Sequence, residues 1–160
     1  MKTGSNILLI LVLLMMVSCD QKRTFDEYKS FSGEWHKDSV AVFDIPDIDT
    51  TGKYNLFVNL RANSAYPFNN IFLIVSMEHP GRLTQVDTLE YQMADAEGNM
   101  LGDGFSDVKE SKLFYKENVR FKKGRYRMKV RHAVRESGKV DGVASLKGIT
   151  EVGFRIESVE

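Results

Sequence analysis

The chain lacks several features that would place a protein in a familiar functional class. Its 160 residues contain a single cysteine, Cys19, so no disulfide can form within the chain. The 22 basic and 22 acidic residues balance, which argues against general binding to nucleic acid. Neither the G-x-S-x-G motif of serine hydrolases nor the phosphate-binding loop G-x-x-x-x-G-K-[ST] occurs. We therefore expect a protein that is not an enzyme.

Metal and cofactor sites have equally little support. The three histidines, His36, His79 and His132, are far apart in the sequence, and none has the spacing of a metal ligand. Residues 95–99 have only a superficial likeness to a calcium loop, because the full series of oxygen ligands is missing. We expect a turn there, structural roles for the histidines, and neither a metal nor a cofactor.

What the chain does have is a short hydrophobic leader. Lys2 precedes an apolar run over residues 7–17, and the small Ser18 follows the run. A helix that spans a bilayer needs about 20 apolar residues, so this run is too short to be one. Residues 1–18 are therefore interpreted as a signal peptide that is removed on export.

Cys19 directly follows this leader, and its position has a chemical interpretation. Residues 16–19 look like a bacterial lipobox, in which the cysteine receives an S-diacylglycerol group and, after cleavage, an N-palmitoyl group. Two acyl chains already hold a protein stably on a bilayer. We expect a lipoprotein anchored to a bacterial membrane, and we expect this membrane to be the outer membrane. Residues 19–30 are then a polar tether and residues 31–160 the folded domain. Two simpler interpretations stay open, a plain signal peptide with a cysteine near its cleavage site and a buried free cysteine.

Beyond the tether, apolar residues recur with a period of two, which is typical of strands. Tyr54, Leu56, Val58 and Leu60 give the clearest example, because they alternate with more polar residues. About eight or nine short strands and no convincing long helix predict an all-β fold, an antiparallel β-sandwich for which the jelly roll is one candidate topology. The strands are expected at residues 40–45, 54–61, 71–75, 84–93, 100–105, 112–121, 126–133 and 152–157.

Some of these segments carry more specific predictions. Residues 71–75 are apolar on both faces, which is typical of a central strand covered from both sides. Residues 94–99 predict a hairpin connection in which Gly98 takes a positive φ. Gly102 and Gly104 predict a bulge or a close approach of two backbones.

A strip of basic residues is the main candidate interaction surface. Alternation along one strand puts four cations on the same face, about 7 Å apart, where they repel one another. One interpretation is pairing with carboxylates on neighbouring strands, such as Glu90, Glu151 or Glu157. The other is a docking strip for an anionic partner or for lipid headgroups. The strip consists of Arg125, Arg127, Lys129 and Arg131.

Exposed aromatic residues suggest an alternative function. Exported β-sandwiches can bind carbohydrate by stacking aromatic rings on sugar faces. Four residues near the start of the domain have the side chains for this role, which would make the protein a surface glycan-binding lipoprotein. They are Phe31, Trp35, Tyr66 and Phe68.

Five separated stretches of the chain support a more definite assignment. They are residues 66–75, 87–95, 102–110, 113–116 and 148–157. Their sequences resemble the gliding motility lipoprotein family GldH, and together they sample nearly all of the chain that follows the leader. The resemblance implies a non-enzymatic lipoprotein of the cell envelope, whose partners are components of the gliding machinery and of its linked protein-secretion system. The family supplies no catalytic residues to carry over; it implies only that Cys19 is the acylated residue.

Overall fold

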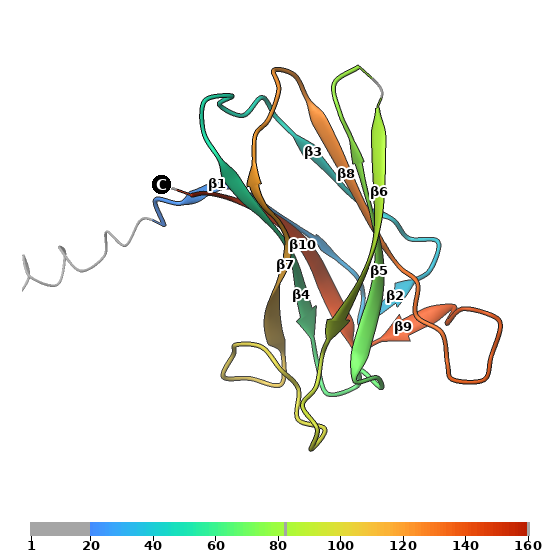
Figure 1. Ribbon diagram of the computed structural model, residues 1–160. Helices are drawn as coiled ribbons and strands as arrows, with labels where there is room; N and C mark the ends of the chain where they lie inside the picture. Colours follow the sequence, from blue (N-terminus) through green and yellow to red (C-terminus); the bar gives the residue numbers. More distant parts are fainter. Residues whose placement is uncertain (1–19, 82, 160) are drawn as a thin grey trace, which may run out of the picture.

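The computed structural model describes residues 20–81 and 83–159, and the regular elements of this part of the chain are ten β-strands (Figure 1). None of the described residues belongs to a helix long and apolar enough to cross a membrane. In chain order the strands are β1 (Arg23–Ser30), β2 (Glu34–His36), β3 (Ala41–Ile45), β4 (Tyr54–Ala62), β5 (Asn70–Glu78), β6 (Thr84–Gln92), β7 (Lys109–Val119), β8 (Tyr126–His132), β9 (Ser145–Lys147) and β10 (Ile149–Ser158).

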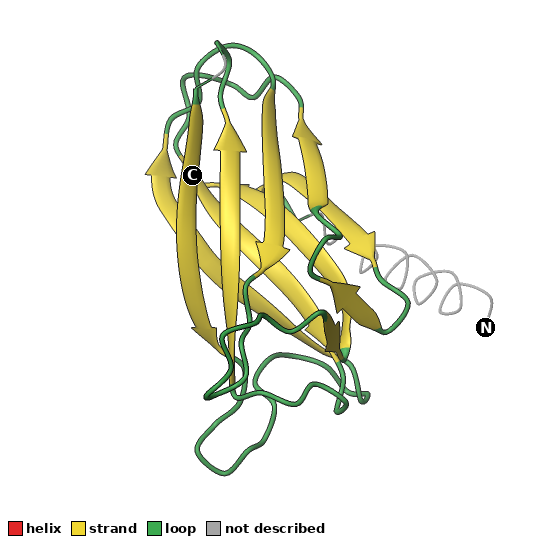
Figure 2. Cartoon of the chain, turned by 90° about the vertical axis from the view of Figure 1, so that its right-hand side faces the viewer, coloured by secondary structure: helices red, strands yellow, loops and turns green. Residues whose placement is uncertain are grey.

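Two four-stranded antiparallel sheets pack face to face, and their loops gather at the two ends of the sandwich (Figure 2). The first sheet has the order β1-β10-β4-β7 and the second has the order β3-β8-β5-β6. The short strands β2 and β9 pair separately. Without that small pair, the eight remaining strands have the order of a jelly roll, in which β5 and β6 form a hairpin within the second sheet. The predicted sandwich is confirmed, and its strand order is now known.

Alternation of the side chains explains why these strands form two packed layers. In β4 the side chains of Leu56, Val58 and Leu60 are completely buried. In β8 the side chains of Met128 and Val130 face them from the second sheet and are equally buried, whereas their sequence neighbours reach solvent. Each strand thus contributes one face to a common core, which is the main source of stability in a domain without disulfides.

Most predicted strands are present within a few residues of the predicted bounds, with one clear exception. Residues 100–105 do not form a strand. They lie in the connection from β6 to β7, where Asp103 makes an isolated bridge to Glu110. Gly102 has a φ of 111° and Gly104 a φ of 149°, and a Cβ at either position would lie 2.6 Å from a backbone carbonyl oxygen. The prediction of close backbone approach at these glycines is confirmed.

The environment predicted for residues 71–75 is wrong in part. Their strand, β5, is internal to the second sheet, as expected. However, only one of its faces is buried, since Ile71, Leu73 and Val75 point into the core while Phe72 and Ile74 are half-buried on the outer face. Among the residues that the structure describes, no second layer covers these apolar outer side chains.

The predicted bounds of the tether are also wrong. Arg23–Ser30 form β1, which pairs along its length with β10. The polar composition of this segment reflects its position at the edge of the first sheet. Within the described chain, only residues 20–22 precede the fold.

Candidate interaction surfaces

The first described residues lead directly into one end of the sandwich. Ser158 of β10 pairs with Tyr54 of β4, and the backbone N–H of Ser158 also donates to the carbonyl oxygen of Lys22 at 2.8 Å. We call this end, with the start of β1, the anchor end, because Cys19 lies only a few residues before it in the sequence. Cys19 itself is outside the described residues, and its acylation stays a prediction.

Arg155 fastens the entering chain to the first sheet. Its guanidinium forms ion pairs with Asp20, with Asp26 at 3.0 Å and with Glu157 at 2.6 Å. The hydrogen bond from Arg155 lowers the pKa of Asp20. Burial alone would raise the pKa of Glu157, but hydrogen bonds from Lys112 and Arg155 outweigh burial and lower it. The position of residue 20 is thus coupled to the fold.

A second polar network crosses the outer face of the first sheet, and sequence reasoning missed it. Arg61 of β4 donates to Glu110 at 2.6 Å and to Glu151 at 2.5 Å. Its guanidinium lies 4.3 Å from the centroid of the Tyr28 ring, a cation–π contact. The Asn59 amide donates to the Tyr28 hydroxyl at 2.8 Å, and this hydroxyl donates to Glu110 at 2.9 Å.

This network has clear physical consequences for its members. The two carboxylates raise the pKa of Arg61, so its charge is permanent. Burial, followed by the hydrogen bond to Glu110, raises the pKa of Tyr28 to about 12, so the phenol stays protonated. Gly153 of β10 lies beneath the Tyr28 ring, and a Cβ there would be 2.7 Å from a ring carbon. The signal that could have revealed the network was a glycine inside a strand of otherwise large residues.

The structure places Arg127, Lys129 and Arg131 of the predicted strip on one face of β8, as expected, and Arg125 directly before this strand. Arg125, Arg127 and Arg131 are exposed and Lys129 is half-buried, while the alternate residues are buried. The predicted carboxylate partners of the strip, in contrast, are wrong.

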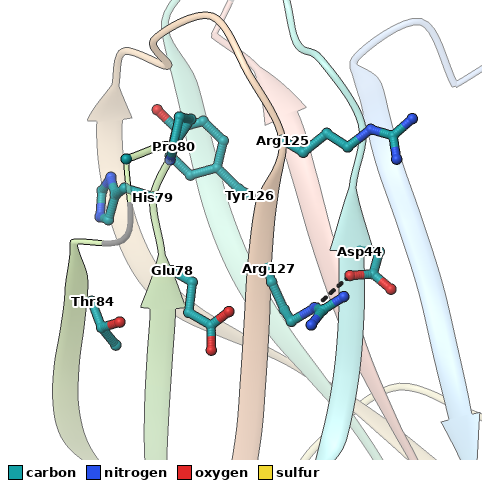
Figure 3. A pocket seen from close by; sticks show the side chains of 9 residues that line it. Asp44, Glu78, His79, Pro80, Thr84, Arg125, Tyr126 and Arg127 are labelled. Carbon is teal, nitrogen blue, oxygen red and sulfur yellow. Dashed lines mark hydrogen bonds and ion pairs between the residues drawn. The ribbon is translucent and has the colours of Figure 1, made fainter.

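Asp44 of β3 and Glu78 of β5 are the carboxylates that compensate the strip. Arg127 bonds Asp44 at 2.6 Å (Figure 3). Lys129 bonds Glu78. The bond and the charge of Asp44 raise the pKa of Arg127. These two acids flank β8 because β3 and β5 are its neighbours in the sheet, which the sequence did not reveal.

The three acids predicted to pair with the strip have other partners. Glu151 and Glu157 belong to the first sheet, where they pair with Arg61 and Arg155. Glu90 lies on β6 and accepts a hydrogen bond from Asn70.

The strip borders a shallow hollow of about 660 Å³ at the end of the second sheet. Arg125 extends above Asp44, away from Glu78, and His79 and Tyr126 close the upper side (Figure 3). Within residues 20–81 and 83–159, Arg125 makes no ion pair. A docking role for the strip therefore stays a prediction that rests mainly on this residue and Arg131.

The aromatic residues considered for glycan binding do not form an exposed platform. Trp35 and Tyr66 are buried in the core. Phe31 stacks on Trp35 with 5.3 Å between ring centroids, and Phe68 packs edge-on against Tyr66 at 5.9 Å. These contacts pack the four rings into two pairs, which stabilises the domain.

The predicted turn at residues 95–99 is confirmed. Gly98 has a φ of 86°. The Asp95 carboxylate accepts hydrogen bonds from the backbone N–H groups of Glu97 and Asn99, and the bonds from Asn99 lower the pKa of Asp95. The loop therefore uses its own carboxylate internally. In the part of the chain that the structure describes, no group of three His, Cys, Asp or Glu side chains could hold a metal ion.

At the end of the sandwich opposite the anchor end, a tight loop presents a single aromatic side chain. Asp103 and Glu110 exchange two backbone hydrogen bonds of 2.8 Å and close the loop. Phe105 lies between them and is fully exposed. The acidic Asp103 and Asp107 flank it in the sequence. We call residues 103–110 the Phe105 loop.

Comparison with known proteins provides an independent line of argument. The profile of a family described as GldH lipoprotein matches residues 23–156. The gliding motility lipoprotein GldH of Flavobacterium johnsoniae is 59% identical over 157 residues, which cover 98% of each chain. The gliding motility lipoprotein GldH homolog of Christiangramia forsetii is 50% identical over 149 residues, which cover 92% of this chain and 91% of the relative.

Likeness to solved structures is much weaker. A family GH115 4-O-methyl-α-glucuronidase is 13% identical, with a TM-score of 0.45, and the match covers 89% of this chain and 18% of the enzyme. A likeness at this level supports no statement about function.

Proposed function

The chain belongs to the GldH lipoprotein family, and from this premise we propose that it is a lipid-anchored component of the cell envelope that supports gliding motility and the linked protein-secretion machinery. It acts by binding other envelope proteins and catalyses no reaction. Its anchor is Cys19, carrying S-diacylglycerol and N-palmitoyl groups, and its membrane is the outer membrane. The observation that carries the proposal is the identity to the F. johnsoniae protein over nearly the whole chain.

The shape of the molecule supports a scaffold of this kind. The described chain begins at one end of the sandwich, where Arg155 and the pairing of β1 with β10 hold it in place. The opposite end, which carries the Phe105 loop, is then directed away from the bilayer. Confinement to a membrane raises the local concentration of partners without any new contact, so even modest affinity at this end is sufficient.

Phe105 is the residue we assign to partner contact at the far end. Aromatic side chains are enriched at the centres of protein interfaces, where they fill pockets on the partner. The two hydrogen bonds between Asp103 and Glu110 hold the loop in shape, so little conformational entropy is lost on binding. Asp103 and Asp107 favour a pocket with a basic rim.

Affinity purification from gently solubilised membranes tests the proposal. The tagged wild-type protein is expected to co-purify with other envelope proteins of the motility or secretion machinery. Phe105→Ser is expected to weaken this association at least about ten-fold, the loss typical of an interface hot spot. Val140→Ser is the matched control, since Val140 is also an exposed apolar residue but lies in the connection between β8 and β9.

One outcome would contradict the proposed role, and another would contradict only the assigned contact. A deletion strain that glides and secretes normally would remove the motility assignment. Equal co-purification of wild type, the Phe105 variant and the Val140 variant would leave the scaffold role standing but exclude the Phe105 loop as its contact.

A further inference from the structure

We propose that the anchor end is also a docking patch for anionic phospholipid headgroups, formed by Lys22, Arg23, Lys53 and Arg120. This docking role rests on the proposed function and names the surface of the anchored domain that lies on the membrane. The patch binds the headgroup layer of the same bilayer that holds the acyl chains.

The short connection to the anchor brings this surface to the membrane. Only Asp20, Gln21 and Lys22 lie between Cys19 and the first residue of β1. Fully extended, they span about 10 Å. They are not fully extended, because the Arg23 N–H donates to the Asp20 carbonyl at 3.2 Å and closes a turn. The anchor end therefore lies within about one Debye length of the headgroups, where charges on the two surfaces interact strongly.

Backbone hydrogen bonds bring the basic residues of the patch together. Lys22 accepts from the N–H of Ser158, and Lys53 accepts from the N–H of Val159, the next residue. Arg120 lines a hollow of about 390 Å³ together with Lys53 and Val159. Residues that precede β1, precede β4 and follow β7 thus meet around the end of β10.

The cations of this patch are not held in ion pairs within the described chain, although the charge of Arg23 contributes to the lowered pKa of Asp20. None of its four cations forms an ion pair among residues 20–81 and 83–159. Asp20 and Glu157 are both engaged by Arg155. In the neighbouring loop, the Asp49 carboxylate accepts two hydrogen bonds from Thr51. Asp49 and the exposed Glu117 reduce the positive charge near the patch but do not contact its cations.

The connection from β6 to β7, at the opposite end of the molecule, has the opposite character, because residues 93–108 contain four acidic and no basic residues. The four are Asp95, Glu97, Asp103 and Asp107. An anionic bilayer therefore attracts the anchor end and repels the connection that carries the Phe105 loop. This asymmetry holds the domain upright and keeps Phe105 accessible, which a three-residue connection alone would not ensure.

Vesicle binding by a chain without lipid tests the patch directly. The mature chain, residues 19–160 with Cys19→Ser, is mixed with phosphatidylcholine vesicles that contain either no anionic lipid or about one third phosphatidylglycerol. We expect binding only to the anionic vesicles, and we expect it to weaken as salt is raised. Each cation near an anionic surface strengthens binding about five-fold, so Lys22→Ala, Lys53→Ala and Arg120→Ala together should reduce affinity about 100-fold.

A matched triple variant makes the test specific to this surface. Lys37, Arg135 and Lys147 are exposed cations around β2 and β9, and their replacement by alanine removes the same charge elsewhere. The control should retain affinity within about three-fold. An equal loss in both triple variants, or equal binding of the wild type to neutral and anionic vesicles, would overturn the docking patch. Because Cys19 is absent from the assay, such a result would leave the anchored scaffold itself untouched.

Discussion

Replacing Gly153 with alanine tests whether the network around Tyr28 holds β1 to the first sheet. Gly153 is in β10, directly opposite Tyr28 of β1, and its φ is not in the left-handed region. An alanine there is compatible with the backbone, but its Cβ would lie 2.7 Å from one carbon of the Tyr28 ring and 2.8 Å from another. The ring must therefore move away from the sheet surface.

The expected change in the free energy of unfolding follows from the contacts that the Tyr28 ring would lose. Tyr28 takes part in two hydrogen bonds, with Glu110 and Asn59, each contributing about 1 kcal/mol. The contact with Arg61 contributes about 0.5–1 kcal/mol. Against this loss of about 2.5–3 kcal/mol, alanine in a strand is favoured over glycine by about 0.5–1 kcal/mol. We expect Gly153→Ala to lower the free energy of unfolding by about 2 kcal/mol.

Urea unfolding of the mature chain with Cys19→Ser measures this change, in a double-mutant cycle with Tyr28→Ala. Without the ring there is no collision, so Gly153→Ala should then stabilise the protein by about 0.5–1 kcal/mol. Gly142→Ala is the control, because a Cβ there meets its nearest atom at an ordinary 3.5 Å. A coupling energy below about 0.5 kcal/mol between Gly153 and Tyr28 would refute the reasoning.

Three further predictions concern other parts of the chain. Labelled palmitate should be incorporated into the wild type and absent from Cys19→Ser, and equal labelling of both would exclude acylation at this residue. Gly148→Ala should lower the free energy of unfolding in urea by at least about 2 kcal/mol, because Gly148 has a φ of 84° and a Cβ there would lie 2.3 Å from the backbone nitrogen of Tyr66; a change below about 0.5 kcal/mol would contradict this. Burial lowers the pKa of His132, so as pH falls below about 6.5 the unfolded state takes up the proton first and stability is lost. The melting temperature of the wild type should therefore fall from pH 8 to pH 5 more steeply than that of His132→Phe, and parallel curves would show that His132 is not responsible.

Strands with a strongly alternating pattern were predictable, and strands without one were not. The core strands β4 and β8 lie within one residue of their predicted bounds, because alternate apolar side chains must be removed from water. β1 was missed because Asp26, Glu27 and Lys29 make it polar, and only β10 beside it supplies the pairing. The short strands β2 and β9 contain too few residues to show any period.

The basic strip also shows what alternation along a strand can predict and what only the strand order decides. Alternation alone established that Arg127 and Lys129 share a face, because the side-chain period of a strand is two. The identity of their partners depended on which strands flank β8. Asp44 is 83 positions away from Arg127 in the sequence, and no local pattern connects them.

The sequence by itself determined the class of the fold, the leader, the cysteine expected to carry the lipid and the resemblance to the GldH family. These features depend on local order along the chain, that is, on hydrophobic period, motif spacing and residue identity. Only the tertiary structure decided the strand order, the short connection between Cys19 and the fold, the network around Tyr28 and Arg61, and the position of the acidic β6–β7 connection at the end opposite the anchor end. Those features depend on contacts between residues far apart in sequence, which form because two apolar sheet faces must be buried against each other.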